Sequence, residues 1–129
     1  MPLGRTSGLP PPPGRLVLVV EDEFLIAMDL ELLLRRHGWR VLGPAATVAE
    51  ALRLLEAERP DAAVLDVNLR GELVTPVAEA LRALTVPFVL ASAHEPVDRV
   101  APALAGAVNV GKPTSETRLL AALTCVVER

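Results

Sequence analysis

Apolar residues follow two patterns that alternate along the chain. In the first pattern, three to five consecutive residues are mostly apolar, which is typical of strands buried on both faces of a parallel sheet. In the second pattern, apolar residues recur every three or four positions, as they do on the buried face of a helix. The first pattern predicts five strands, at residues 16–20, 39–42, 62–65, 88–91 and 108–110.

The second pattern predicts a helix after each strand. The first helix, at about residues 24–37, ends before Gly38. Its predicted apolar face carries Leu25, Met28 and Leu32. The second helix begins with the capping box Thr47-Val48-Ala49-Glu50, in which the Thr hydroxyl and the Glu carboxylate accept hydrogen bonds from backbone donors. It cannot continue through Pro60, and its apolar face carries Val48, Ala51, Leu52 and Leu55.

Three more helices are predicted. One spans about residues 76–84 and starts with a proline, which the first turn of a helix tolerates. A weaker one spans residues 97–104 and contains Pro102. The last has Glu116 in its first turn, and its apolar face carries Leu119, Leu123 and Val126.

The strict alternation of strands and helices predicts an α/β protein with a flavodoxin-like, doubly wound parallel sheet. We expect five strands in the order 2-1-3-4-5 and five helices. The domain is predicted to span residues 15–129, after a Pro-rich flexible tail at residues 1–14. In such sheets ligands bind beyond the carboxyl ends of the strands, near the switch point between strands 1 and 3.

Polar side chains follow four of the five predicted strands. Glu21 and Asp22 follow the first strand, Asp66 the third and Ser92 the fourth, and Lys112 comes shortly after the fifth. Three neighbouring carboxylates repel one another unless a cation neutralises them, and Mg²⁺ prefers oxygen ligands. A lysine suits phosphate oxygens, and a carboxylate can act as a nucleophile. Together these groups predict a phosphoryl-transfer site.

Each of these residues also has an ordinary structural explanation. Asp66 can cap a turn, and the acidic residues 21–23 can form the first turn of a helix, where the helix dipole favours them. Ser92 can bond to the local backbone, and Lys112 can be a solvated charge. Their convergence on one edge of the predicted sheet favours the site.

Composition limits the other functions that the chain could have. Its 129 residues suit one domain, and a net charge of -3 without a basic cluster argues against a nucleic-acid partner. No apolar stretch approaches the about 18 residues of a membrane span. Cys125 is the single cysteine, so an internal disulfide is excluded. We expect Cys125 to be a buried apolar residue of the last helix, in a cytoplasmic protein.

From about residue 15 to residue 127 the sequence resembles response-regulator receiver domains. Val19-Val20-Glu21-Asp22-Glu23 is similar to the acidic pair of that family, and Val64-Leu65-Asp66-Val67-Asn68-Leu69 is similar to its phospho-acceptor segment. Ser92 falls on the Ser/Thr position after the fourth strand, and Lys112-Pro113 on the Lys-Pro after the fifth.

The resemblance implies that Asp66 accepts a phosphoryl group from the phosphohistidine of a sensor histidine kinase or a histidine phosphotransfer protein. It implies that Lys112 pairs first with Asp66 and then with the phosphoryl group, which Ser92 also binds. The Lys112–Pro113 peptide is expected to be cis. The implied Mg²⁺ ligands are Asp22, Asp66, the backbone carbonyl of Asn68 and, through water, Glu21.

Two features depart from the common receiver pattern. Asn109 stands where receivers usually carry a Tyr or Phe that rotates inward on activation, and residues 106–112 are one residue short. Residues 86–94 are similar to a stand-alone subgroup with a motif near Pro-Phe-x-Phe-Ala-Thr-Gly-Tyr, which also lacks this aromatic residue. Ala93 and His94 differ from that motif. His94 is either a residue that tunes dephosphorylation or an ordinary loop residue.

We expect phosphorylation to stabilise one of two arrangements of the surface formed by the fourth strand, the fourth helix and the fifth strand. A downstream protein partner would read this surface, and a homodimer could form through the fourth helix, fifth strand and fifth helix. Because no output domain follows the last helix, we expect action by protein contact or as a phosphorelay intermediate. A fragment of a larger hybrid kinase would end in the same way.

Two other functions remain open. A phosphatase of the haloacid-dehalogenase type would use a similar nucleophile, but it needs a second Asp where this chain has Asn68. A pseudo-receiver would have the same fold and serve as a binding module without phosphorylation. The acidic pair, Asp66, Ser92 and Lys112 argue against it. We therefore expect a receiver that acts as no enzyme beyond its own phosphorylation and dephosphorylation.

Overall fold

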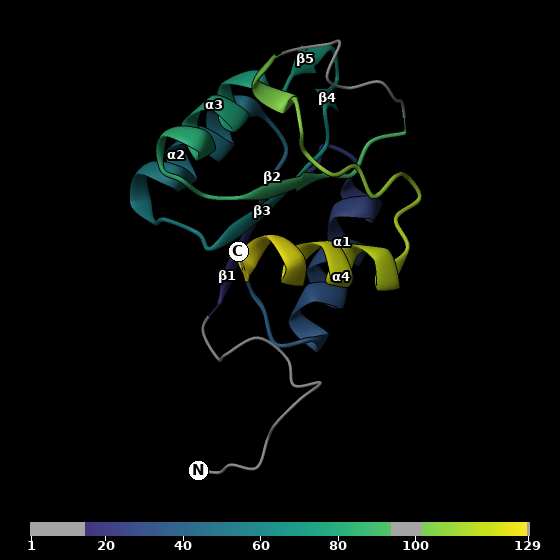
Figure 1. Ribbon diagram of the computed structural model, residues 1–129. Coiled ribbons are helices and arrows are strands. Elements are labelled where there is room, and N and C mark those ends of the chain that lie inside the picture. The colour runs from purple at the N-terminus through teal and green to yellow at the C-terminus, as the bar shows by residue number, and fades with distance from the viewer. Residues whose placement is uncertain (1–14, 94–101, 129) are drawn as a thin grey trace.

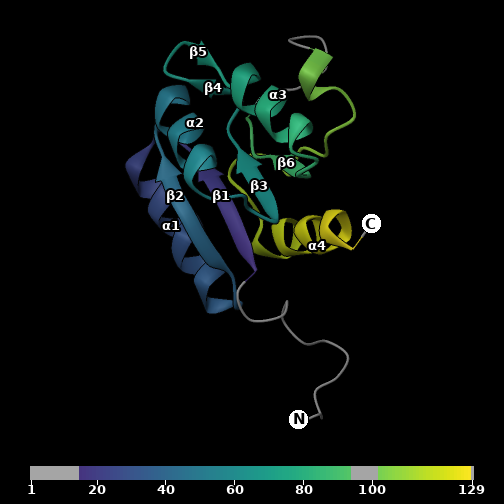
Figure 2. The same ribbon diagram turned by 90° about the vertical axis from the view of Figure 1, so that its left-hand side faces the viewer.

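The computed structural model describes residues 15–93 and 102–128, which form a parallel sheet covered by helices on both faces (Figure 1). The strands of this sheet are β1 (Leu16–Val20), β2 (Arg40–Ala45), β3 (Ala62–Leu65) and β6 (Phe88–Leu90). Their order is β2-β1-β3-β6, and Figure 2 shows them side by side. The first four predicted strands thus occupy the predicted positions of an α/β, flavodoxin-like fold.

Four α-helices in the described part of the chain cover the sheet in pairs. They are α1 (Phe24–Arg36), α2 (Val48–Ala57), α3 (Thr75–Ala83) and α4 (Glu116–Val127). In Figure 1, α2 and α3 lie above the sheet, and α1 and α4 lie below it. Side chains of β1 alternate between the two cores, since successive strand residues point to opposite faces. No α-helix among the described residues has the length and apolar character needed to cross a membrane.

The predicted fifth strand is reduced to a single parallel bridge between Leu90 and Asn109. The N–H of Leu90 donates to the carbonyl of Val108, and the N–H of Val110 donates to the carbonyl of Leu90, both at 2.8 Å. Glycines with positive φ lie three residues before and two residues after Asn109 and limit the extended segment. A five-stranded sheet is therefore not confirmed.

The predicted fourth helix falls largely outside the described residues, where the tail at residues 1–14 and His94 also lie. Its described end, Pro102–Leu104, is a short 3-10 helix, η2. Two short strands lie in the segment that was expected to be a loop, β4 (Asn68–Leu69) and β5 (Glu72–Leu73), and they pair antiparallel. The backbone shortly after Asp66 is therefore in an extended conformation.

Two predictions of buried side chains are wrong. The predicted apolar face of α1 is exposed, by 68% at Leu25, 38% at Met28 and 52% at Leu32. The buried residues of α1 are Ala27, Leu30 and Leu34. Nine of the 13 residues of α1 are apolar, so two different faces fit the helical period. Cys125 is also exposed, because it lies on α4 away from the side that buries Leu119 and Leu123.

The start of α2 follows the predicted capping box. The N–H of Glu50 donates to Thr47 Oγ1 at 3.1 Å, and the Glu50 carboxylate accepts from the N–H of Ala46 at 3.0 Å. Before this helix, β2 continues past Gly43-Pro44, where the sequence predicts its end. A Cβ at Gly43 would lie 2.8 Å from the Ala45 nitrogen, so the turn of the backbone there requires glycine. This path brings Ala45 alongside the end of β1.

Candidate functional site

Backbone hydrogen bonds fix the residues at the ends of β1 and β3. The N–H of Glu21 donates to the carbonyl of Ala45, and the N–H of Asp66 donates to the carbonyl of Val20, both at 2.9 Å. These bonds continue the parallel ladder by one residue beyond each strand. The main chain at Glu21 and Asp66 therefore has little freedom to move.

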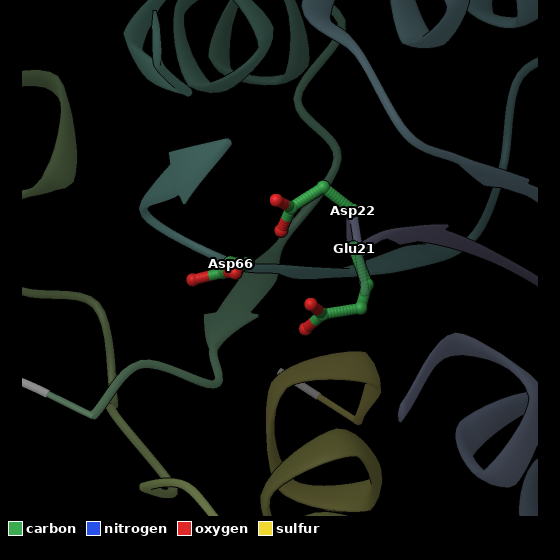
Figure 3. A group of neighbouring side chains, drawn as sticks. All are labelled: Glu21, Asp22 and Asp66. Atoms are coloured by element: carbon green, nitrogen blue, oxygen red, sulfur yellow. The ribbon is translucent and has the colours of Figure 1, made fainter. Parts of the chain in front are cut away.

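Three carboxylates meet at this edge of the sheet. Carboxylate oxygens of Glu21, Asp22 and Asp66 lie within 4.8 Å of one another, and Figure 3 shows the three side chains as one group. Glu21 is 2% exposed and Asp66 is 6% exposed. Buried carboxylates at this separation repel one another when ionised. The structure thus brings the three predicted acidic residues together in a place that favours a cation.

The ammonium group of Lys112 lies between two of these carboxylates. Lys112 Nζ donates to Asp66 Oδ2 at 2.9 Å and to Glu21 Oε2 at 3.2 Å. Burial alone would lower the pKa of Lys112, but the hydrogen bonds to Asp66 and Glu21 raise it above its ordinary value. The lysine therefore stays charged at neutral pH. The Lys112–Pro113 peptide is cis, as the resemblance implied.

One buried oxygen of Glu21 has no hydrogen-bond partner among the described residues. Glu21 Oε1 lies 3.1 Å from Lys112 Nζ but is not aligned for a hydrogen bond. Burial raises the pKa of Glu21, and the charge of Asp66 adds to the rise, while the N–H of Glu23 and Lys112 oppose it. An unsatisfied buried carboxylate oxygen is costly. A hard cation held by Asp22 and Asp66 would satisfy it through a bound water, so these residues fit Mg²⁺.

Ser92 and Asn68 lie at the ends of the neighbouring segments. Ser92 is 7% exposed and follows β6, and its backbone N–H donates to Asn109 Oδ1 at 3.1 Å. Asn68 begins β4, and its side-chain Oδ1 accepts from the N–H of Gly71 at 2.6 Å. That side chain shapes the turn after Asp66. The roles of the Ser92 hydroxyl as a hydrogen-bond donor to the phosphoryl group and of the Asn68 carbonyl as a metal ligand remain predictions.

Two residues near the site were missed in the sequence. Arg70 Nε lies 3.3 Å from Asp22 Oδ2, and Arg70 Nη2 lies 3.4 Å from the Asp22 carbonyl. Asn109, which the sequence marks only as a departure from the receiver pattern, binds two backbone N–H groups with its side chain. Both contacts depend on loop conformations, including φ of 54° at Arg70, which no periodic pattern encodes.

The fold and the convergence of acidic and basic groups define a class of protein. Residues 17–124 match the response regulator receiver domain family, and the chain belongs to this family. The resemblance seen in the strand-end residues is thereby confirmed.

Individual relatives agree with this assignment. The chain is 36% identical over 118 residues to the transcriptional regulatory protein PdtaR of Mycobacterium tuberculosis, an alignment that covers 89% of this chain and 58% of PdtaR. The chain spans about half the length of the curated relatives it matches.

Solved structures show the same fold. A putative response regulator from Chloroflexus aurantiacus superposes with a TM-score of 0.78 at 29% identity, covering 90% of this chain and 99% of that one. The receiver domain of the sensor histidine kinase PA1611 from Pseudomonas aeruginosa also has a TM-score of 0.78, at 27% identity, covering 90% and 99%. That structure has a magnesium ion coordinated in its active-site cleft.

Proposed function

We propose that the chain is a phospho-accepting receiver of a two-component or phosphorelay system. A carboxylate oxygen of Asp66 would attack the phosphorus of a phosphohistidine on a sensor histidine kinase or a histidine phosphotransfer protein. The P–O bond to Asp66 forms as the P–N bond breaks, and the donor histidine leaves as neutral imidazole after taking up a proton. The observation that carries this proposal is the contact of Lys112 with the buried Asp66 inside a group of three carboxylates.

The charges of the site favour this reaction. Lys112 Nζ donates to Asp66 Oδ2 at 2.9 Å, and it would bind the phosphoryl oxygens once they carry the negative charge. Ser92 would donate its hydroxyl to one of these oxygens. Mg²⁺, when bound, supplies positive charge that offsets the repulsion between the carboxylates and the incoming phosphoryl group. Its proposed ligands are Asp22, Asp66, the carbonyl of Asn68 and, through water, Glu21.

Exposed apolar side chains beside the site are consistent with a protein as the phosphoryl donor. Phe24 is 74% exposed and Leu25 is 68% exposed, and they begin α1 shortly after the acidic pair. Met28 and Leu32 continue this exposed face along α1. Because α1 begins at Phe24, close to the acidic pair, apolar residues of a donor that reaches Asp66 could cover the patch.

The remaining predictions belong to the same proposal. The switched surface would lie near β6 and the segment before α4, where a downstream protein or a second copy of the chain would bind. The protein would work in the cytoplasm, without nucleic acid, and would turn over no substrate beyond its own acyl phosphate.

One experiment tests the proposal against its rivals. The protein is incubated with acetyl phosphate and Mg²⁺, and its intact mass is measured. A receiver gains one phosphoryl group that hydroxylamine removes, and the gain disappears with EDTA or in Asp66→Asn. Asp61→Asn is a matched control, because Asp61 is exposed and its carboxylate accepts from the N–H of Leu16 at the opposite ends of the strands.

The other outcomes also discriminate. A chain that stays unmodified under all of these conditions is a binding module, and the proposal fails. Steady release of phosphate from small phosphate esters would show a phosphatase instead.

A further inference from the structure

The side chain of Asn109 joins two segments that carry groups of the proposed site. Its Oδ1 atom accepts hydrogen bonds from the backbone N–H of Ser92 at 3.1 Å and from the backbone N–H of Gly111 at 3.0 Å. Ser92 follows β6, and Gly111 directly precedes Lys112. One oxygen atom therefore binds both segments at the same point.

This contact lies where the parallel ladder would continue. The bridge at Leu90 uses the carbonyl of Val108 and the N–H of Val110. In a parallel pair the bonds are evenly spaced, so the next bond would run from the N–H of Ser92 to the carbonyl of Val110. The N–H of Ser92 donates to the Asn109 side chain. Asn109 thus extends the connection from Leu90 to Ser92, which lies two residues beyond the bridge and is the residue whose hydroxyl would bind the phosphoryl group.

The segment on the other side of Asn109 is tied to α4 and to Asp66. Thr114 Oγ1 donates to the carbonyl of Gly111 at 2.9 Å. Arg118 Nη2 lies 3.4 Å from the carbonyl of Asn109. Lys112, one residue after Gly111, reaches Asp66 with its ammonium group. A connected set of bonds therefore runs from Ser92 through Asn109 to the lysine.

We propose that Asn109 is a positioning residue that sets the spacing between the Ser92 hydroxyl and the Lys112 ammonium around a phosphoryl group on Asp66. This inference rests on the proposed function. Small displacements of groups that position a reacting atom have large effects on rate. The metal ligands instead follow β1 and β3, which are held by backbone bonds. Loss of the Asn109 amide should therefore slow phosphoryl uptake and leave Mg²⁺ binding unchanged.

The test compares two replacements of similar size. Asn109→Leu removes the acceptor oxygen, and Asn109→Asp keeps it. With acetyl phosphate and Mg²⁺, we expect uptake to be about tenfold slower in Asn109→Leu and to recover to within about threefold of wild type in Asn109→Asp. The Mg²⁺ dissociation constant, measured by calorimetry, should stay within about twofold in Asn109→Leu. Equal slowing in both variants, or a matching loss of Mg²⁺ affinity, overturns the proposal.

A double variant shows whether Asn109 acts through Ser92. If it does, Ser92→Ala/Asn109→Leu should be no slower than Ser92→Ala alone, and full additivity would contradict that route. Amide hydrogen exchange in the wild type provides a measurement that needs no variant. The N–H groups of Ser92 and Gly111 should be protected, and fast exchange at both overturns the proposal.

The two proposals can fail separately. Wild-type protein that takes up no phosphoryl group overturns the proposed function, and the positioning role fails with it. Normal uptake by the wild type together with normal uptake by Asn109→Leu overturns the positioning role alone.

Discussion

The central strands and the outer edge of the sheet hold their site residues by different means. At the end of β1 and β3, Glu21 and Asp66 are fixed by backbone bonds that continue the ladder. At the edge, the connection to β6 is one bridge, extended by the Asn109 side chain. The central half of the site, which carries Glu21, Asp22 and Asp66, is thus held more rigidly than the edge half, which carries Ser92 and Lys112.

This difference suits a switch. A cation needs ligands at fixed positions, and the continuous ladder provides them. A response to phosphorylation needs a part of the molecule with two arrangements of similar free energy. A segment held by a few side-chain bonds can shift without disrupting the core. Lys112 connects the two halves of the site, because it lies in the edge half and its ammonium group donates to Asp66 in the central half.

The largest expected effect comes from removing this connection. Lys112→Met takes away the positive charge that would stabilise the phosphoryl group, and loss of one such group typically costs about 10²- to 10³-fold in rate. We expect uptake from acetyl phosphate to fall by that factor. Lys112→Arg keeps the charge on a longer side chain, so its rate of uptake should lie between those of Lys112→Met and the wild type. Uptake by Lys112→Met within about threefold of wild type would show that the halves act independently.

A valine-to-alanine substitution beside each half of the site compares how rigidly the two regions are held. Val64 in β3 is 1% exposed and Val110 near the edge is 2% exposed, and both pack in the same core. We expect Val64→Ala to lower the free energy of unfolding by about 2 to 3 kcal/mol, because the rigid ladder cannot close the cavity. Val110→Ala should cost about half as much. Urea denaturation gives both values, and equal losses would contradict the comparison.

The sequence predicts the rigid half better than the edge. Buried strands leave continuous apolar runs, and in a parallel sheet their carboxyl ends meet, so Glu21, Asp22 and Asp66 could be placed together before the structure. The same rule placed Lys112 near them. The fifth strand was overestimated because the segment at residues 108–110 has β-branched residues but makes only one bridge.

Contacts made by single side chains in loops could not be predicted in this way. The contacts of Asn109 depend on the turn at Gly111, and those of Arg70 on its own left-handed conformation. The buried face of α1 was also ambiguous, because its apolar residues surround the helix. The predicted face, which includes Leu25 and Leu32, fits the helical period as well as the buried face does, but it is exposed.

A smaller effect is expected from pH in the absence of metal. Burial raises the pKa of Glu21 above its ordinary value of 4.5. A carboxyl with a higher pKa in the folded chain than in the unfolded chain contributes stability at low pH and loses it as the pH rises through the folded pKa. In EDTA, the free energy of unfolding should therefore fall as the pH rises from about 4.5 through the raised pKa.

Mg²⁺ should remove this fall, because the cation favours the ionised carboxyl. Glu21→Gln should remove it in EDTA as well, whereas Glu23→Gln, which changes an exposed neighbour, should leave it in place. Urea denaturation over a series of pH values measures the effect. If the free energy of unfolding of Glu21→Gln still falls with pH in EDTA, the fall comes from another titratable group. Ionised Glu21 would then not destabilise the central half of the site.

The smallest expected effect concerns Arg70, which lies outside both halves and contacts the central one. Its guanidinium lies 3.3 Å from Asp22 Oδ2, on the carboxylate that is proposed to ligate the metal. The Arg70 side chain is 79% exposed, so this ion pair contributes at most about 1 kcal/mol. If Arg70 competes with the cation, Arg70→Gln should tighten Mg²⁺ binding by roughly two- to fivefold in calorimetry.

Arg40→Gln is the matched control, because Arg40 pairs with Glu58 at 3.4 Å and begins β2, away from the carboxyl ends of the strands. It should leave Mg²⁺ binding unchanged. Weaker Mg²⁺ binding in Arg70→Gln would mean that Arg70 holds Asp22 in position rather than competing for it. The geometry of the metal ligands would then depend on an exposed loop side chain, and the rigidity ascribed to the central half would not extend to Asp22.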